Sequence, residues 1–203
     1  MGDDRIFSGT VVARTWMRSA LIASVRNGFR FFVLAITLLS MPAPRGTTDV
    51  LPAAEIPYNL RFFNTHTGER LDIVYRYANA YDPDALAQLD HYLRDSRTGE
   101  VHTYDPRVFD LLHDLIAALG RPNAEIDVIC GYRTFWSNEY LRTHGHRVAQ
   151  HSLHMRAMAI DIRVQGIPTA KLRDAALALH RGGVGYYADS DFVHVDVGRV
   201  RRW

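Results

Sequence analysis

Two segments late in the chain alternate between apolar and polar positions. In 157–163, three large apolar side chains fall on one face and Asp161 on the other. In 192–197, three valines share one face and His194 lies on the other. This period of two is typical of β-strands with one buried face. If the two strands pair with their apolar faces matched, Asp161 and His194 come to the same surface.

Helices are predicted by periodicity and by end signals. Asp82-Pro83 and Asp105-Pro106 each place an acceptor side chain before a proline at the first helical position. Leucines spaced three or four residues apart follow both signals, and Gly120 ends the second helix. A short third helix is predicted at 137–142. A fourth begins at Thr169, which we expect to cap it.

The remaining strands complete the prediction of the fold. A hairpin is predicted in which two strands flank the polar turn 64–69. The predicted strands lie at 60–63, 71–75, 126–131, 157–164, 184–187 and 192–197. The sequence therefore predicts an α+β domain, with helices packed on a small, mainly antiparallel sheet.

The beginning of the chain differs from the rest. Residues 1–45 hold six arginines and two aspartates, and 31–39 is an uncharged apolar run. The run is too short to cross about 30 Å of hydrocarbon as a helix, and an apolar run after arginines is typical of a secretory signal. We predict that 1–45 is a signal or membrane-anchor segment that can contact the membrane, with a buried N-terminal helix as the alternative. Prolines mark 46–57 as a linker, which leaves 58–203 as the catalytic domain.

Charge and cysteine content restrict the function classes. The whole chain has 24 basic and 22 acidic side chains, so residues after 45 hold 18 basic and 20 acidic ones. A slightly acidic body lacks the basic patch of a nucleic-acid-binding domain, and we predict no nucleic-acid partner. Cys130 is the only cysteine and lies in an apolar run. We expect it to be buried and inert, a nucleophilic role being the alternative.

A third metal-binding side chain lies near the first alternating strand. His154 is seven residues before Asp161, close enough for the loop to fold back beside it. Two imidazoles and one carboxylate suit Zn²⁺ and leave a fourth position open for water, as in catalytic zinc sites. With ten histidines in the chain, a chance grouping is the alternative.

Several motifs resemble one family. The segment 152–161 is similar to the Ser-x-His-x6-Asp motif of the D-alanyl-D-alanine peptidase and Hedgehog-type zinc fold, and 192–196 is similar to its second ligand strand. With 64–69, 131–133 and 183–187, the chain most resembles the murein endopeptidase K-like branch, over residues 58–198. One departure is Ala157, where that family usually has glycine.

The resemblance implies a role for each site residue. It implies that His154, Asp161 and His194 hold Zn²⁺. Asp191, three residues before His194, is the expected general base, with Asp196 and His151 as further candidates. Asp196 is expected chiefly to hydrogen-bond a ligand imidazole. Arg133 matches an arginine that binds a substrate carboxylate, and a structural salt bridge is its alternative. Ser152 is expected in the loop beside the metal, as a hydrogen-bonding and substrate-binding group rather than a nucleophile.

The predicted function is that of an exported zinc metallopeptidase. The resemblance implies hydrolysis of amide bonds in peptidoglycan stem peptides or crosslinks, with the periplasm or cell envelope as the location. D-alanyl-D-alanine carboxypeptidase activity is the nearest variant. A zinc-containing cell-wall-binding module without turnover is the alternative from another class, because Asp191 is a shorter carboxylate than the usual glutamate.

Overall fold

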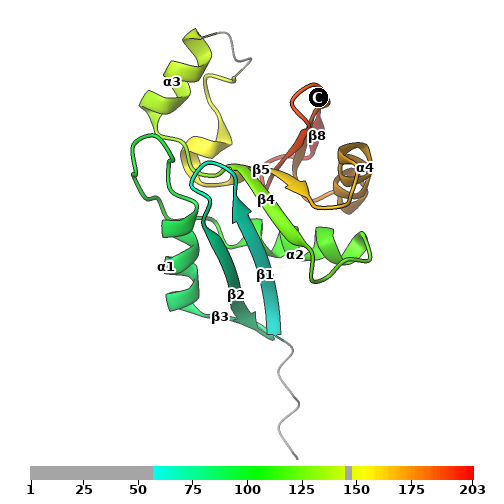
Figure 1. Cartoon of the computed structure of the whole chain (residues 1–203). Coiled ribbons are helices and arrows are strands. Elements are labelled where there is room, and N and C mark those ends of the chain that lie inside the picture. The colour runs from blue at the N-terminus through cyan, green and yellow to red at the C-terminus, as the bar shows by residue number, and fades with distance from the viewer. Residues whose placement is uncertain (1–56, 145–147) are drawn as a thin grey trace, which may run out of the picture. The chain divides into compact units, whose positions relative to one another are not determined.

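The computed structural model describes residues 57–144 and 148–203 (Figure 1). The predicted signal or anchor segment, 1–45, lies outside these residues, as does the predicted linker, 46–57, except for Pro57. Pro57 is the first residue of the first strand. Within the described part of the chain, no helix is both long and apolar enough to cross a bilayer.

The described residues form one mixed sheet of eight strands, in the order β3-β2-β1-β4-β5-β7-β6-β8. The strands are β1 (Pro57–Asn64), β2 (Arg70–Tyr77), β3 (Ala80–Tyr81), β4 (Glu125–Cys130), β5 (Ala159–Val164), β6 (Gly183–Tyr187), β7 (Phe192–Asp196) and β8 (Arg201–Arg202). Five pairings are antiparallel, whereas β1 with β4 and β6 with β8 are parallel. The α+β class is confirmed. The prediction of a small, mainly antiparallel sheet is wrong in size and in omitting the parallel pairs, of which β1 with β4 joins segments far apart in sequence.

The helices are α1 (Pro83–Tyr92), α2 (Arg107–Ala118), α3 (Phe135–Thr143) and α4 (Thr169–Leu179), with a short 3-10 helix, η1 (Leu153–Arg156). Asp82 caps α1 as predicted, accepting hydrogen bonds from the first turn of the helix. Thr169 does not cap α4, because its hydroxyl donates instead to Asp191 at 2.8 Å. The sequence signals therefore predict where the helices lie, but they do not predict every capping contact correctly.

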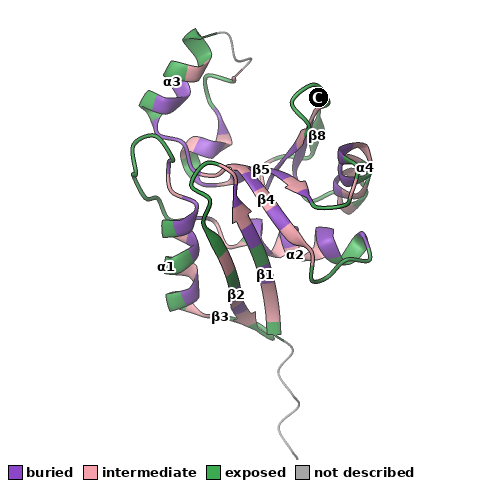
Figure 2. Ribbon diagram, in the orientation of Figure 1, coloured by how far each residue is buried: buried purple, intermediate pink, exposed green. Residues whose placement is uncertain are grey.

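The apolar faces of the strands are buried as the alternation predicts (Figure 2). Ile160 and Val193 are fully buried and belong to the same core as Leu172 of α4. Phe62 of β1 and Leu112 of α2 belong to this core as well. Because this face is covered, the polar side chains of β5 and β7 point to the opposite face of the sheet.

The segment after β4 is fixed by backbone and side-chain contacts. The amide of Tyr132 donates to the carbonyl of Leu93 at 2.8 Å. Asp95, which is buried, accepts hydrogen bonds from the amide and hydroxyl of Thr134, both at 2.8 Å. Thr134 in turn caps α3. In Figure 1, α3 and η1 lie close together beyond the end of β4, so this end of the sheet carries the polar residues of interest.

Candidate metal centre

A row of paired residues crosses four neighbouring strands. Cys130 of β4 pairs with Asp161 of β5, Asp161 pairs with His194 of β7, and His194 pairs with Gly185 of β6. Directly paired residues of antiparallel strands project from the same face. A register shift between Val128 and Cys130 brings Cys130 into this row. The prediction that Asp161 and His194 share a surface is confirmed.

Three side chains meet at this row, and each is less than a tenth exposed. His154 reaches it from η1, with Nε2 3.2 Å from Oδ1 of Asp161 and 3.1 Å from Nδ1 of His194. Nδ1 of His194 lies 2.8 Å from the same Asp161 oxygen. Donor atoms around a tetrahedral ion with bonds of about 2.0–2.2 Å lie roughly 3.4 Å apart. The three donors therefore fit a zinc ion after shifts of a few tenths of an ångström.

The orientation of His154 is set by two contacts within its loop. Its Nδ1 donates to the carbonyl of Gly131 at 2.7 Å, because a carbonyl can only accept, and this leaves the Nε2 lone pair free for a metal. The Ser152 hydroxyl accepts a hydrogen bond from the His154 amide at 3.3 Å and caps η1. Ser152 thus acts on the loop, as expected. Its contact with a substrate stays a prediction.

Ala157 ends η1 in a left-handed conformation, with φ of 48° and full burial. This region favours glycine, since a Cβ there is strained. The geometry gives the physical reason for glycine at this position in the family that the chain resembles. Alanine, with the smallest side chain after glycine, adopts the same backbone.

Asp196 orients the second imidazole. Its Oδ2 accepts a hydrogen bond from Nε2 of His194 at 3.1 Å, which leaves Nδ1 of that ring free to bind a metal. Asp196 is fully buried and also accepts from the amides of Gly183 and Gly198, at 3.0 and 2.8 Å. The Arg201 guanidinium donates to both carboxylate oxygens, at 2.7 and 3.1 Å. The expected hydrogen bond between Asp196 and the imidazole of His194, a predicted ligand, is confirmed.

The cluster favours positive charge. Burial lowers the pKa of His154, but the Asp161 carboxylate and Cys130 raise it more, to about 10. Burial raises the pKa of Asp161, yet the two neighbouring imidazoles hold it well below its ordinary value. An ionised carboxylate between two imidazoles can bind a metal cation in place of protons.

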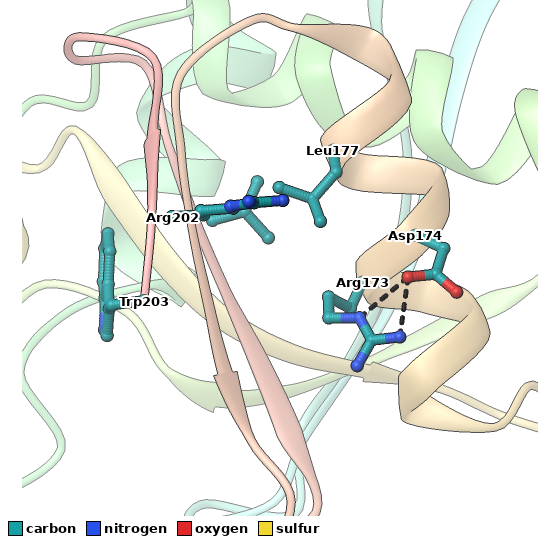
Figure 3. A pocket seen from close by; sticks show the side chains of 6 residues that line it. Arg173, Asp174, Leu177, Arg202 and Trp203 are labelled. Atoms are coloured by element: carbon teal, nitrogen blue, oxygen red, sulfur yellow. Dashed lines mark hydrogen bonds and ion pairs between the residues drawn. The ribbon is translucent and has the colours of Figure 1, made fainter.

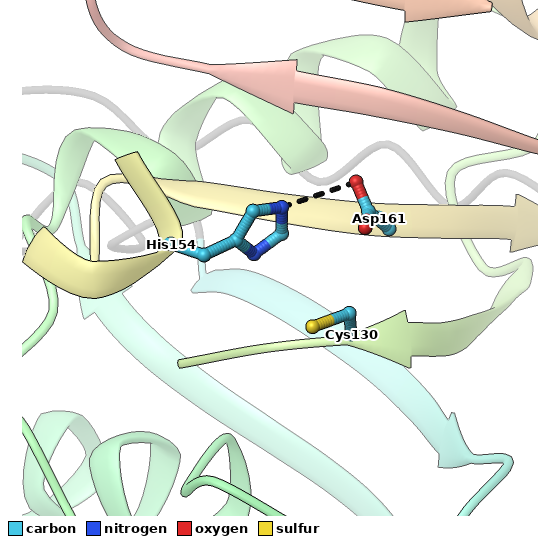
Figure 4. A group of neighbouring side chains, drawn as sticks. All are labelled: Cys130, His154 and Asp161. Carbon is cyan, nitrogen blue, oxygen red and sulfur yellow. Dashed lines mark hydrogen bonds and ion pairs between the residues drawn. The ribbon is translucent and has the colours of Figure 1, made fainter. Parts of the chain in front are cut away.

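Cys130 lies beside these groups (Figure 4) and is half-buried, short of the full burial that we expected. Its inertness stays a prediction. Its sulfur, one His154 nitrogen and one Asp161 oxygen lie within 4.8 Å of one another and form an alternative donor set. Burial raises the pKa of the thiol, but His154 and Arg133 lower it more. Since the donors of the set with His194 are at most 3.2 Å apart, that set encloses an ion more closely.

Arg133 is buried next to Asp161. Its Nη2 lies 3.8 Å from Oδ2 of Asp161 and donates to the sulfur of Cys130 at 3.3 Å. Nη1 donates to Asn138 at 3.3 Å, and Nε has no hydrogen-bond partner among the described residues. The guanidinium therefore adjoins the candidate metal centre and has an unused donor.

Asp191 does not meet the three candidate ligands. It lies in the turn before β7 with φ of 51°, and its carboxylate accepts from Thr169 at 2.8 Å and lies 3.6 Å from Arg163. Thr169 begins α4, which packs on the apolar face of the sheet. The other candidate base, His151, is exposed. The role of Asp191 stays a prediction.

The sequence reasoning missed two residues, Arg201 and Trp203. Arg201 neutralises Asp196, and the Trp203 ring centroid is 5.2 Å from that of His194. Arg201 lies in β8 and Trp203 directly follows it. This strand has only two residues, which is too short to show an alternating pattern. The repeated arginines of 199–202 before a tryptophan were the available signal.

An α+β domain with two imidazoles and a carboxylate at one face of its sheet belongs to the class of proteins that can hold a catalytic metal ion. Residues 52–203 match the family described as peptidoglycan L,D-endopeptidase MepK, Peptidase_M15_2, and the chain belongs to this family. It is 44% identical to the probable peptidoglycan L,D-endopeptidase MepK of Haemophilus influenzae over 147 residues, 72% of this chain and 79% of that protein. It is 36% identical to peptidoglycan L,D-endopeptidase MepK of Escherichia coli K12 over 170 residues, 84% and 91% of the two chains. No solved structure matches significantly.

Proposed function

We propose that this protein is a zinc metallopeptidase that hydrolyses amide bonds in peptidoglycan stem peptides or crosslinks. The observation that carries the proposal is the meeting of His154, Asp161 and His194, with donor atoms at most 3.2 Å apart, in a member of this endopeptidase family. The names of the relatives specify an L,D-endopeptidase, and we propose the same bond class here. D-alanyl-D-alanine carboxypeptidase activity is the variant to be compared.

The three donors would hold the ion, whose chemistry is to polarise a carbonyl and to make water acidic enough to act near neutral pH. Arg133 would bind a substrate carboxylate through its guanidinium, whose Nη2 lies 3.8 Å from Oδ2 of Asp161 and whose buried Nε has no hydrogen-bond partner among the described residues. Ser152 would fix the His154 backbone and line the substrate site. Asp196 would keep the His194 ring in its metal-binding orientation.

Proton transfer is assigned to Asp191 as a proposal from its position three residues before His194. The carboxylate would have to leave Thr169, or act through water, to come within about 2.6–3.2 Å of a reacting proton. Asp191→Asn should lower kcat and remove the acidic limb of the pH–rate profile. A proportionate loss at every pH, or none, argues against a base at this position.

Export is also part of the proposal. Peptidoglycan lies outside the cytoplasmic membrane, and the predicted signal or anchor segment in 1–45 would carry the catalytic domain to the periplasm or cell envelope. Whether this segment is removed can be read from the mass of the mature protein in an envelope fraction. Recovery of the unprocessed chain only in the cytoplasm would contradict export.

A non-catalytic, zinc-containing wall-binding module is the second candidate, favoured by the engagement of Asp191 with Thr169. One digest separates the two candidates. The purified protein is incubated with muropeptide dimers, with and without zinc, with a chelator, and beside His154→Ala. The proposed enzyme gives new product masses with zinc and none with chelator or in the variant. Binding without products, or cleavage insensitive to chelator, contradicts it.

A further inference from the structure

The fourth position of the row across the sheet is a glycine. Cys130, Asp161 and His194 fill the first three positions with polar side chains, and Gly185, the partner of His194, has none. A Cβ built on Gly185 would lie 2.7 Å from two atoms of the Trp203 ring. The ring of Trp203 therefore occupies the space where a side chain of this row would stand.

The backbone brings Trp203 to this place. Its amide donates to the carbonyl of Val184 at 3.2 Å, and the amide of Tyr186 donates to the Trp203 carbonyl at 3.1 Å. These bonds lie on either side of Gly185 and continue the parallel pairing of β8 with β6. The ring is thus positioned over β6, the strand that neighbours His194.

The ring is also held in one orientation. Its Nε1 donates to the hydroxyl of Tyr187 at 3.0 Å, and the guanidinium carbon of Arg201 lies 4.9 Å from the ring centroid. The His194 ring centroid is 5.2 Å away, at a 49° tilt. Contacts with three side chains and a glycine backbone fix the indole.

Burial does not account for this arrangement, because Trp203 keeps 51% of its surface exposed. An indole that served only to pack against the edge of the sheet would stabilise the fold more if its apolar surface were buried. A fixed aromatic ring with an open face offers contact area at little cost in conformational entropy. Trp203 also lines a groove of about 480 Å³ together with Arg173, Leu177 and Arg202, but in Figure 3 these three side chains lie across the strand ribbons from the indole.

We propose that Trp203 is a wall of the substrate site, whose exposed indole contacts apolar or planar peptide groups next to the bond that is cleaved. This inference rests on the proposed function. Arg133 adjoins Asp161 and Trp203 adjoins His194. A bound stem peptide would thus place a carboxylate near the guanidinium and an aliphatic side chain or peptide plane against the indole. Gly185 is required because any side chain there displaces the ring.

The kinetic test compares the zinc-loaded wild type with Trp203→Leu and Gly185→Ala, the second of which displaces the ring without removing it. With a muropeptide dimer, both variants should lose about tenfold in kcat/KM, mainly through KM, as expected for a lost binding contact. Their zinc affinity, measured by chelator competition, should stay within about threefold of wild type. Trp136→Leu, which removes another exposed tryptophan, is the matched control and should stay within about twofold. Unchanged KM in Trp203→Leu, or an equal loss in Trp136→Leu, overturns the proposal.

Fluorescence provides a test that does not depend on cleavage. Metal-free full-length protein is titrated with the same dimer, and quenching is compared between wild type, Trp136→Phe and Trp203→Phe. Quenching should persist in Trp136→Phe and disappear in Trp203→Phe, even if the protein binds peptidoglycan without cutting it. If the dimer still quenches Trp203→Phe, or does not quench the wild type, the proposal that Trp203 lines the substrate site is contradicted. Failure of the zinc-loaded wild type to cleave contradicts the proposed function instead.

Discussion

Asp196 and His194, two residues apart on β7, are joined by a hydrogen bond of 3.1 Å from Nε2 of the imidazole to Oδ2 of the carboxylate. Because this bond uses Nε2, the Nδ1 atom of His194 faces Asp161 and His154. Alternation along a strand places residues i and i+2 on one face, so the sequence itself sets up this pair. Arg201 then balances the charge of the buried carboxylate.

Asp196→Asn should weaken zinc binding. An amide oxygen is a poorer acceptor for the His194 ring, and loss of such a supporting hydrogen bond typically costs 10–100-fold in metal affinity. Competition with a chromophoric chelator measures the change. Asp191→Asn, which alters a carboxylate that does not contact the ligands, is the control and should bind zinc as wild type does. Equal affinities in all three proteins would show that Asp196 does not support the site.

Arg133→Lys should reduce recognition of substrate carboxylates. Lysine keeps the charge but lacks the planar fork that binds a carboxylate through two hydrogen bonds. We expect KM to rise about tenfold for a muropeptide with a free carboxylate and to change little for its amidated analogue. Arg142→Lys, in an exposed pair with Glu139, serves as the control. An equal loss on both substrates would instead show that Arg133 acts only through its ion pair with Asp161.

Gly131→Ala should damage both the fold and the metal centre. A Cβ at this position would lie 2.6 Å from the backbone oxygen of Leu93, and overpacking of this kind costs about 1–3 kcal/mol. The carbonyl of Gly131 also accepts the hydrogen bond from His154, so zinc affinity should fall as well. Chemical denaturation and chelator competition measure the two effects.

Gly99→Ala is the matched control for this substitution. Gly99 has a positive φ but no atom within 4 Å of a built Cβ, so only backbone strain of about 1 kcal/mol is expected. Its zinc affinity should equal that of wild type. A Gly131→Ala protein as stable as Gly99→Ala would contradict the close packing of Gly131 on Leu93.

Asp95 should make the stability of the metal-free protein depend on pH. Burial raises the pKa of Asp95, but the amide hydrogen bonds from Thr134 and Arg97 help to hold it below its ordinary value. A carboxylate with a lowered folded-state pKa stabilises the protein above its unfolded pKa of about 3.9, and this is lost as the pH falls through the folded pKa. The difference in Tm between wild type and Asp95→Asn should therefore narrow below about pH 4. A constant difference from pH 6 to pH 3 would contradict this.

Much of the site could be predicted because it lies on regular strands. The alternation in β5 and β7 is enough to place Asp161 beside His194, and the structure pairs them directly. No periodic pattern fixes His154, which lies in a loop. Its spacing of seven residues before Asp161 made it a candidate, and the resemblance implied its role as a ligand. The buried faces of β5 and β7 follow from the same alternation.

The remainder depends on contacts between distant segments. The parallel pairing of β1 with β4 enlarges the sheet, and a register shift before Cys130 turns that residue toward His154. Neither feature changes the hydrophobic pattern. The Trp203 ring can lie beside His194 because Gly185 has no side chain. In a sequence pattern, a glycine at this position only weakens the prediction of a strand.

The most direct test of the account is the zinc content of the protein. Wild type, His154→Ala and His194→Ala are loaded with zinc, dialysed against metal-free buffer, and analysed by mass spectrometry for metal per chain. Circular dichroism confirms that the variants are folded. The account predicts one tightly bound zinc per wild-type chain and little or none in either variant. Zinc-free wild type, or variants that retain the metal as wild type does, would contradict it.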